Sequence, residues 1–159
     1  MLKLTKKADY GLIAMKHLAE HAGSASAKEI AEVYGIPAEL LAKILQRMVK
    51  AKLLASQHGT NGGYALAADP RTISAFDVIK AIDGPLFITS CFKGECNQTP
   101  TCTVREPLRK VNESIEEVLS KLTLWDMSAD DNALVELGAN QDATQAGNRV
   151  APVKSLERV

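Results

Sequence analysis

Residues 26–66 read SAKEIAEVYGIPAELLAKILQRMVKAKLLASQHGTNGGYAL. Ser26, followed three positions later by Glu29, is the pattern of a capping box, in which each residue satisfies a backbone donor of the other. This pattern predicts a short helix over Ala27–Tyr34. The positions of this helix that we expect to face the core are Ile30, Ala31 and Val33.

The motif Gly35-Ile36-Pro37 predicts a tight turn into a second helix over about Ala38–Ala51. Pro37 suits the first position of that helix, where a missing N–H costs nothing. A short helix, a glycine turn and an amphipathic helix are typical of a helix-turn-helix, although a plain helical hairpin fits these residues equally well. The apolar positions of the second helix are Leu40, Leu41, Ile44, Leu45, Met48 and Val49.

A β-hairpin is predicted directly after the second helix. Leu53–Ser56 forms a short strand, His58–Gly63 a glycine-rich turn, and Tyr64–Leu66 the returning strand. A hairpin in this place is the wing of a winged helix. The combination favours a winged helix-turn-helix over a plain helical hairpin.

Two further helices flank this region. The first covers about Lys6–His21, with Thr5 as its N-cap. The second begins at the box-like sequence Ser74-Ala-Phe-Asp77 and continues to about Ile82, before Gly84-Pro85 ends it.

A long helix is predicted over about Val104–Leu122. Its apolar side chains recur at spacings of three and four residues and form a narrow stripe between charged positions. Such a stripe suits a partner helix, such as that of a second subunit; packing on the chain's own domain is the alternative. The stripe consists of Leu108, Val111, Ile115, Val118, Leu119 and Leu122.

The predicted fold class is mainly α, a winged helix-turn-helix domain with a long C-terminal dimerisation helix. The composition after about Gly138 turns to Ala, Asn, Gln, Asp and Gly without an apolar period, which predicts a disordered tail. The expected parts are the DNA-binding domain 1–84, the cysteine loop 85–103, the dimerisation helix 104–127 and the tail 128–159.

Composition narrows the class of protein. The 159 residues are 46% hydrophobic, which allows a real core, and no apolar run is long enough to span a membrane. We therefore expect a soluble cytoplasmic protein without membrane partners. The net charge of zero hides an asymmetry, because residues 1–80 hold 11 basic against 7 acidic side chains and residues 81–159 hold 8 against 12. A basic N-terminal half is a mild indication of nucleic-acid binding.

The three cysteines have the spacing Cys91-x4-Cys96-x5-Cys102. Structural zinc sites use paired cysteines two to four residues apart, which this spacing does not match. Thiolates in a loop at wider spacing suit a larger object such as an iron–sulfur cluster. Three unrelated thiols are the alternative.

The outward face of the second helix carries the side chains that could contact DNA in the major groove, and the wing could reach the minor groove or a phosphate. For any single lysine a solvated surface position is the alternative. The candidate DNA contacts are Glu39, Lys43, Gln46, Arg47, Lys50, His58, Thr60 and Asn61. We find no nucleophile–base pair, phosphate loop or paired acid motif, so we expect no enzyme.

Together these motifs resemble the Rrf-type winged-helix iron–sulfur transcriptional regulators, a family that includes IscR, NsrR and regulators of SUF operons. The motifs are Lys3-Leu4-Thr5, Asp9-Tyr10, Ile30-Ala31, Ile36-Pro37, Gly62-Gly63-Tyr64-Ala65-Leu66 and the three spaced cysteines before a long helix. The resemblance covers about Met1–Met127. It implies a homodimer held by the long helix, a cluster in the cysteine loop, a pseudo-palindromic DNA operator, and control of SUF-type cluster assembly genes.

One departure from the family concerns the fourth cluster ligand. In IscR-like members a histidine stands three residues after the last cysteine, where this chain has Arg105, a permanent cation that cannot bind metal. The resemblance to NsrR implies Asp9 of the partner subunit as a fourth ligand, with Glu95, Glu106 or a small exogenous ligand as alternatives. The resemblance to IscR favours a 2Fe–2S cluster and leaves 4Fe–4S open. A cluster-free regulator that responds to thiol oxidation or a small molecule, and a nitric-oxide sensor, are the alternative functions.

Overall fold

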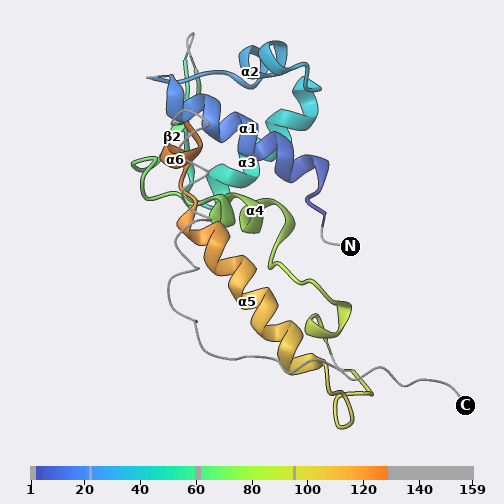
Figure 1. Ribbon diagram of the computed structural model, residues 1–159. Helices are drawn as coiled ribbons and strands as arrows, with labels where there is room; N and C mark the ends of the chain where they lie inside the picture. The colour runs from blue at the N-terminus through green and yellow to red at the C-terminus, as the bar shows by residue number, and fades with distance from the viewer. Residues whose placement is uncertain (1–2, 22, 60–61, 95, 129–159) are drawn as a thin grey trace, which may run out of the picture. The chain divides into compact units, whose positions relative to one another are not determined.

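The computed structural model describes residues 3–21, 23–59, 62–94 and 96–128. The described part of the chain is mainly helical, with one two-stranded antiparallel sheet (Figure 1). None of its helices has the length and apolarity needed to cross a membrane. Thr60 and Asn61 of the wing, Glu95 and the predicted tail from residue 129 onward lie outside the described residues. The elements are α1 Lys6–Glu20, α2 Ala27–Tyr34, α3 Ala38–Lys50, β1 Leu54–Gln57, β2 Gly63–Leu66, α4 Ala75–Asp83, the 3-10 turn η1 Ser90–Phe92, α5 Arg105–Lys121 and α6 Leu124–Ser128.

The helix-turn-helix is formed by α2 and α3. The predicted capping box is present, since Glu29 N–H donates to Ser26 Oγ at 3.2 Å and Ser26 N–H donates to Glu29 Oε2 at 2.6 Å. Gly35 ends α2 in the left-handed conformation, with φ of 63°, where an L side chain is disfavoured. Helix α3 begins at Ala38 as predicted, but Pro37 is its N-cap and not its first helical residue.

The prediction that Val33 faces the core was wrong, because its side chain is 64% exposed. An α-helix turns by about 100° per residue, so a side chain two positions after another lies more than half a turn away. Ala31 is buried at 4% exposure, and Val33 therefore faces outward.

The wing pairs β1 with β2, from Leu54 opposite Leu66 to Gln57 opposite Gly63. The returning strand is also tied to the connection between α1 and α2. Tyr64 N–H donates to the Ala25 carbonyl at 2.8 Å, and Ala25 N–H donates to the Tyr64 carbonyl at 3.1 Å. The wing is thus attached to the helical domain through backbone hydrogen bonds.

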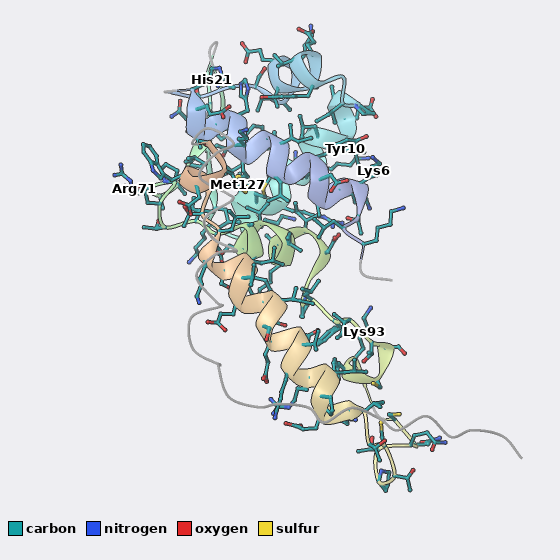
Figure 2. The ribbon with its side chains drawn as sticks, in the orientation of Figure 1. Lys6, Tyr10, His21, Arg71, Lys93 and Met127 are labelled. Carbon is teal, nitrogen blue, oxygen red and sulfur yellow. The ribbon has the colours of Figure 1, made fainter. Side chains whose placement is uncertain are left out.

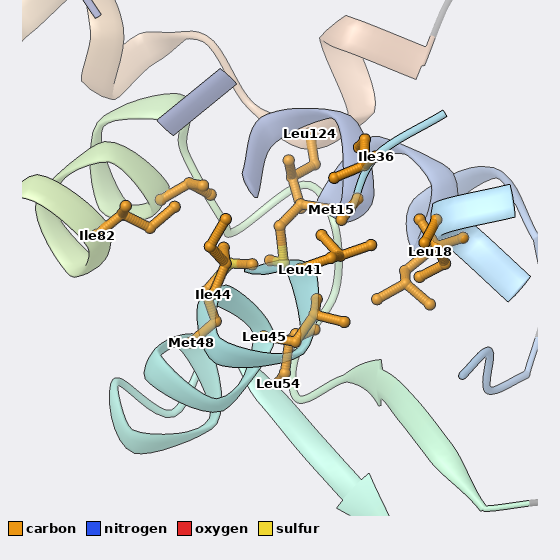
Figure 3. Close-up of a cluster of buried hydrophobic side chains, with 14 of the residues drawn as sticks. Met15, Leu18, Ile36, Leu41, Ile44, Leu45, Met48, Leu54, Ile82 and Leu124 are labelled. Carbon is orange, nitrogen blue, oxygen red and sulfur yellow. The ribbon is translucent and has the colours of Figure 1, made fainter. Parts of the chain in front are cut away.

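The core lies where α1, α3, α4 and α6 meet (Figure 3). Met15 of α1 and Leu41 of α3 are fully buried there. Helices α1 and α4 approach closely at Gly11, because a Cβ at that position would lie 2.1 Å from Ile82 Cδ1. A side chain at residue 11 would therefore require the Ile82 side chain to move.

Helix α6 was not predicted. Thr123 and Asp126 cap it reciprocally, with Asp126 N–H donating to Thr123 Oγ1 at 3.2 Å and Thr123 N–H donating to Asp126 Oδ2 at 2.9 Å. Leu124 is fully buried in the core, and the Arg71 guanidinium lies 4.2 Å from the centroid of the exposed Trp125 ring. The predicted dimerisation segment 104–127 therefore consists of α5 followed by a short helix that packs back on α1.

Candidate DNA-contact surface and cysteine site

Helix α3 has one buried and one exposed face. Its side chains Leu41, Ile44, Leu45 and Met48 lie in the core with at most 2% exposure. The predicted DNA-contact residues on α3 and the described one on the wing are all exposed, namely Glu39, Lys43, Gln46, Arg47, Lys50 and His58. The structure therefore leaves the outward face of α3 accessible, as a recognition helix requires.

Arg47 has an additional contact that the sequence did not indicate. Its Nη1 donates to the Ile82 carbonyl oxygen at 3.1 Å. That carbonyl belongs to the last turn of α4, where a helix leaves carbonyls without partners inside the helix. One nitrogen of the guanidinium therefore joins α3 to α4.

The outward face of α3 also carries two lysines. Within the described ranges, neither Lys43 nor Lys50 takes part in an ion pair. Their ammonium groups face solvent at the surface of α3. Charges of this kind can neutralise phosphates and release counterions.

Asp83, the last residue of α4, makes a second contact, with the start of α1. Both carboxylate oxygens of Asp83 lie 2.8 Å from Thr5 Oγ1, which donates to this carboxylate. Thr5 is the N-cap of α1, and its hydroxyl also accepts from Ala8 N–H at 3.1 Å. The end of α4 is thus held against both α1 and α3.

All three cysteines are half-buried free thiols in the loop between α4 and α5. Figure 2 labels Lys93, which marks this loop. Cys91 lies in η1, and its sulfur is 2.9 Å from Thr89 Oγ1, a hydrogen bond in which either atom can donate. The Cys96 carbonyl accepts from both the backbone N–H and the hydroxyl of Thr99, at 3.0 and 2.7 Å, so the cysteines are separated by local turns.

Arg105 folds back over this loop, and its Nη1 donates to Thr99 Oγ1 at 2.9 Å. An open pocket beside Cys96 is lined by Gly94, Cys96, Asn97, Thr99, Pro100 and Arg105. A guanidinium has no lone pair to offer a metal, so Arg105 acts here as a hydrogen-bond donor to the loop.

The donor set fits an iron–sulfur cluster in kind, because three thiols from one loop are the ligands that such a cluster takes. In the part of the chain that the structure describes, however, no three side chains of His, Cys, Asp or Glu are gathered closely enough to hold a metal ion. The structure thus places the cysteines on one loop without closing them around a common centre.

The candidates for a fourth ligand are not alike. Asp9 lies in the first turn of α1, half-buried, and is not gathered with the cysteines in the described part of the chain. Both oxygens of Glu106 accept from Arg109, at 2.5 and 3.0 Å, and this hydrogen bonding lowers the pKa of Glu106. Glu106 is therefore already engaged in an ion pair on α5.

Helix α5 carries an exposed apolar stripe. Val111 and Val118 are 48% and 59% exposed, and Val104, seven residues before Val111, is 57% exposed. A repeat of seven keeps side chains on one face when two helices coil around each other. An open groove on this face is lined by Lys110, Val111, Ser114, Ile115, Val118 and Leu119.

The described elements form a winged helix-turn-helix with a long helix after the cysteine loop, the architecture of a class of transcriptional regulators. Residues 4–130 match the model of the Rrf2 family, described as iron-dependent transcriptional regulators. The chain belongs to this family.

Similar proteins agree with the assignment. The HTH-type transcriptional regulator IscR of Vibrio vulnificus strain YJ016 is 34% identical over 158 residues, which cover 98% of this chain and 94% of that protein. The solved structure of IscR from T. potens is 36% identical with a TM-score of 0.62, and the alignment covers 91% of this chain and 94% of that one. The structure of CymR (YrzC), the global cysteine regulator of B. subtilis, is 29% identical with a TM-score of 0.65, covering 80% of this chain and 97% of that one.

Proposed function

We propose that this chain is a homodimeric regulator that binds double-stranded DNA and is controlled by an iron–sulfur cluster on Cys91, Cys96 and Cys102. The observation that carries the proposal is the combination of an exposed, charged α3 beside a wing with three half-buried thiols on one loop that leads into α5. The family's description as iron-dependent transcriptional regulators supports the control by iron.

DNA recognition is proposed to use α3 in the major groove, with Lys43 and Lys50 on phosphates or guanine edges and Gln46 on adenine. The wing residues His58, Thr60 and Asn61 would contact the minor groove or a phosphate. Since a two-fold symmetric dimer asks for two-fold symmetric DNA, the operator would be a pseudo-palindrome with half-sites about one helical turn apart.

The dimer is proposed to form through the apolar stripe of α5. Its exposed valines would be buried against the same helix of a second copy, which removes apolar surface from water. Charged side chains of α5 pair along the helix itself, as Lys121 does with Glu117 at 2.7 Å. The groove on the stripe is lined mainly by apolar side chains, with Lys110 as its one charged residue.

The cysteine loop is proposed to close around the cluster with three thiolates, and Asp9 of the second subunit would supply an oxygen ligand. When bound, the cluster supplies a centre that oxygen, iron supply or redox state can alter, and a 2Fe–2S form is favoured. Carboxylate oxygen is a harder and more easily displaced ligand of iron than thiolate, which suits a sensor. SUF-type cluster assembly genes are the proposed targets, because the sequence resembles the SUF-operon regulators of this family.

Anaerobic purification followed by visible spectroscopy tests the cluster. The wild-type protein is expected to absorb visible light, and changing any one of the three cysteines to alanine should remove most of that absorption. Ser90→Ala is the matched control, because Ser90 is exposed in the same loop next to Cys91. A full-strength chromophore in any one cysteine variant would remove that residue from the ligand set.

A second candidate function is that of a cluster-free regulator that responds to thiol oxidation, and the similarity to CymR, a cysteine regulator, favours it. If the anaerobic protein is colourless and its operator affinity changes on thiol oxidation, the cysteines act as a thiol switch and not as cluster ligands. Operator binding measured with and without the chromophore, at one salt concentration, separates the two candidates.

A further inference from the structure

Asn112 stands apart from the rest of α5. It is 7% exposed and is the one buried residue of this helix, among residues that otherwise face solvent or lie half-buried. A buried amide without partners would be destabilising, so its hydrogen bonds show what it is there to do.

The amide of Asn112 binds the backbone of the segment that leads from α4 to the cysteine loop. Its Oδ1 accepts from Ile88 N–H at 3.0 Å, and its Nδ2 donates to the Leu86 carbonyl at 3.2 Å. The second Nδ2 hydrogen is directed to Glu116 Oε1 at 2.7 Å, which orients the amide along the helix.

The two backbone groups come from residues i and i+2 of a segment without regular secondary structure. The side-chain amide therefore replaces the neighbouring strand that would pair with such a segment in a sheet. Because one group donates and the other accepts, a shift of the segment by a single residue would mismatch both hydrogen bonds. Asn112 thus fixes the register of this segment along α5.

Cys91 follows Ile88 by three residues, and the intervening Thr89 bonds its sulfur. We propose that Asn112 is a positioning residue that sets the place of the Cys91 sulfur relative to α5. Cys96 and Cys102 lie further along, beyond the turns of the loop, and do not depend on this contact. The importance of that placement for a cluster rests on the proposed function, whereas the placement itself does not.

The first test uses the full chain without cluster, in two single-cysteine forms that keep either Cys91 or Cys102. We expect Asn112→Ala to raise the alkylation rate of Cys91 by iodoacetamide about ten-fold, which corresponds to about 1.4 kcal/mol, since the loss of its hydrogen bonds to residues 86 and 88 favours local opening. The rate for Cys102 should change less than about two-fold. Ser114→Ala is the control, because Ser114 is exposed on α5 and its hydroxyl donates only to the Lys110 carbonyl.

Amide hydrogen exchange provides a second readout in case the alanine variant folds poorly. Asn112→Asp, made together with Glu116→Gln so that no second carboxylate faces the new one, keeps an acceptor for Ile88 N–H but loses the donor to the Leu86 carbonyl. Ile88 exchange should therefore accelerate less in this double variant than in Asn112→Ala, while the amides of α3 exchange as in the wild type. Equal acceleration of both cysteines, or unchanged alkylation of Cys91 in a folded variant, would overturn the proposal.

A third measurement connects this contact to the cluster. In the anaerobic protein with all three cysteines, Asn112→Ala should lose its visible absorption in oxygen several-fold faster than Ser114→Ala. If the wild type carries no chromophore, the proposed function fails while the alkylation and exchange results still decide the role of Asn112.

Discussion

Replacing Gly63 with alanine is expected to loosen the attachment of the wing to the helical domain. A Cβ at Gly63 would lie 2.7 Å from both the carbonyl carbon and the carbonyl oxygen of Ala25, and 3.0 Å from Ser26 N. All three are backbone atoms, so no change of side-chain rotamer can relieve the contact. The strand or the α1–α2 connection must move, and the two hydrogen bonds between Ala25 and Tyr64 lengthen with it.

The size of the effect follows from opposing contributions. Overpacking of this kind costs about 1–3 kcal/mol, and weakening two backbone hydrogen bonds adds up to about 1 kcal/mol each. Alanine restricts the unfolded chain more than glycine does, which returns about 0.4–1 kcal/mol. We therefore expect a net loss of about 2 kcal/mol in the free energy of unfolding, or about 8 °C in Tm for a domain of this size.

Urea and thermal unfolding of the cluster-free protein measure this loss. Both must be done at one protein concentration, because the proposed dimerisation would make stability depend on concentration. Gly94→Ala is the matched control, since a Cβ there meets no atom within 4 Å. It should leave stability unchanged or raise it by at most about 1 kcal/mol. Equal stability of the Gly63 and Gly94 variants would refute the proposed close approach of the wing.

The remaining predictions concern DNA, dimerisation, pH and the fourth ligand. Lys43→Ala should weaken operator binding and reduce the slope of log affinity against log salt by about 1; an unchanged slope means that Lys43 contacts no phosphate. Ile115→Lys should dissociate the dimer in sedimentation analysis, and an intact dimer would exclude the α5 stripe. Burial, then the neighbouring charge of His21, lowers the pKa of His17 below 6.5. The unfolded chain therefore binds more protons, and stability present above about pH 6.5 should fall as the pH drops below it, less so in His17→Gln. Asp9→Ala should speed cluster loss with the three thiolates still bound, and unchanged lability would exclude Asp9.

Local patterns in the sequence predicted most of the fold. The boxes at Ser26 and Ser74 depend on residues three positions apart, and both helices begin where these boxes place them. Val33 was misplaced because its helix is only eight residues long, so the spacing of its apolar residues does not define one face. Helix α6 was missed although the pair Thr123 and Asp126 has the spacing of a cap; the short apolar segment after it gave no helical period.

The sites were predictable to the extent that they depend on exposure and residue type. Lys43 was expected at the surface of α3 because its neighbours in the helix are apolar at core spacing. The hydrogen bonds from Arg47 to α4 and from Asn112 to residues 86 and 88 join parts of the chain 24 to 35 positions apart. Contacts of this range depend on how the helices pack, and an asparagine within a charged helix was the only available signal for the second of them.

The hydrogen bonds at the two ends of residues 82–88 also limit how far α5 can move relative to α3. The Ile82 carbonyl is held by Arg47 of α3, and Leu86 is held by Asn112 of α5. The four residues from one to the other can span at most about 14 Å when fully extended. This connection acts as a short tether, so a displacement of α5 that exceeds its slack must either pull on α3 or break one of the two hydrogen bonds.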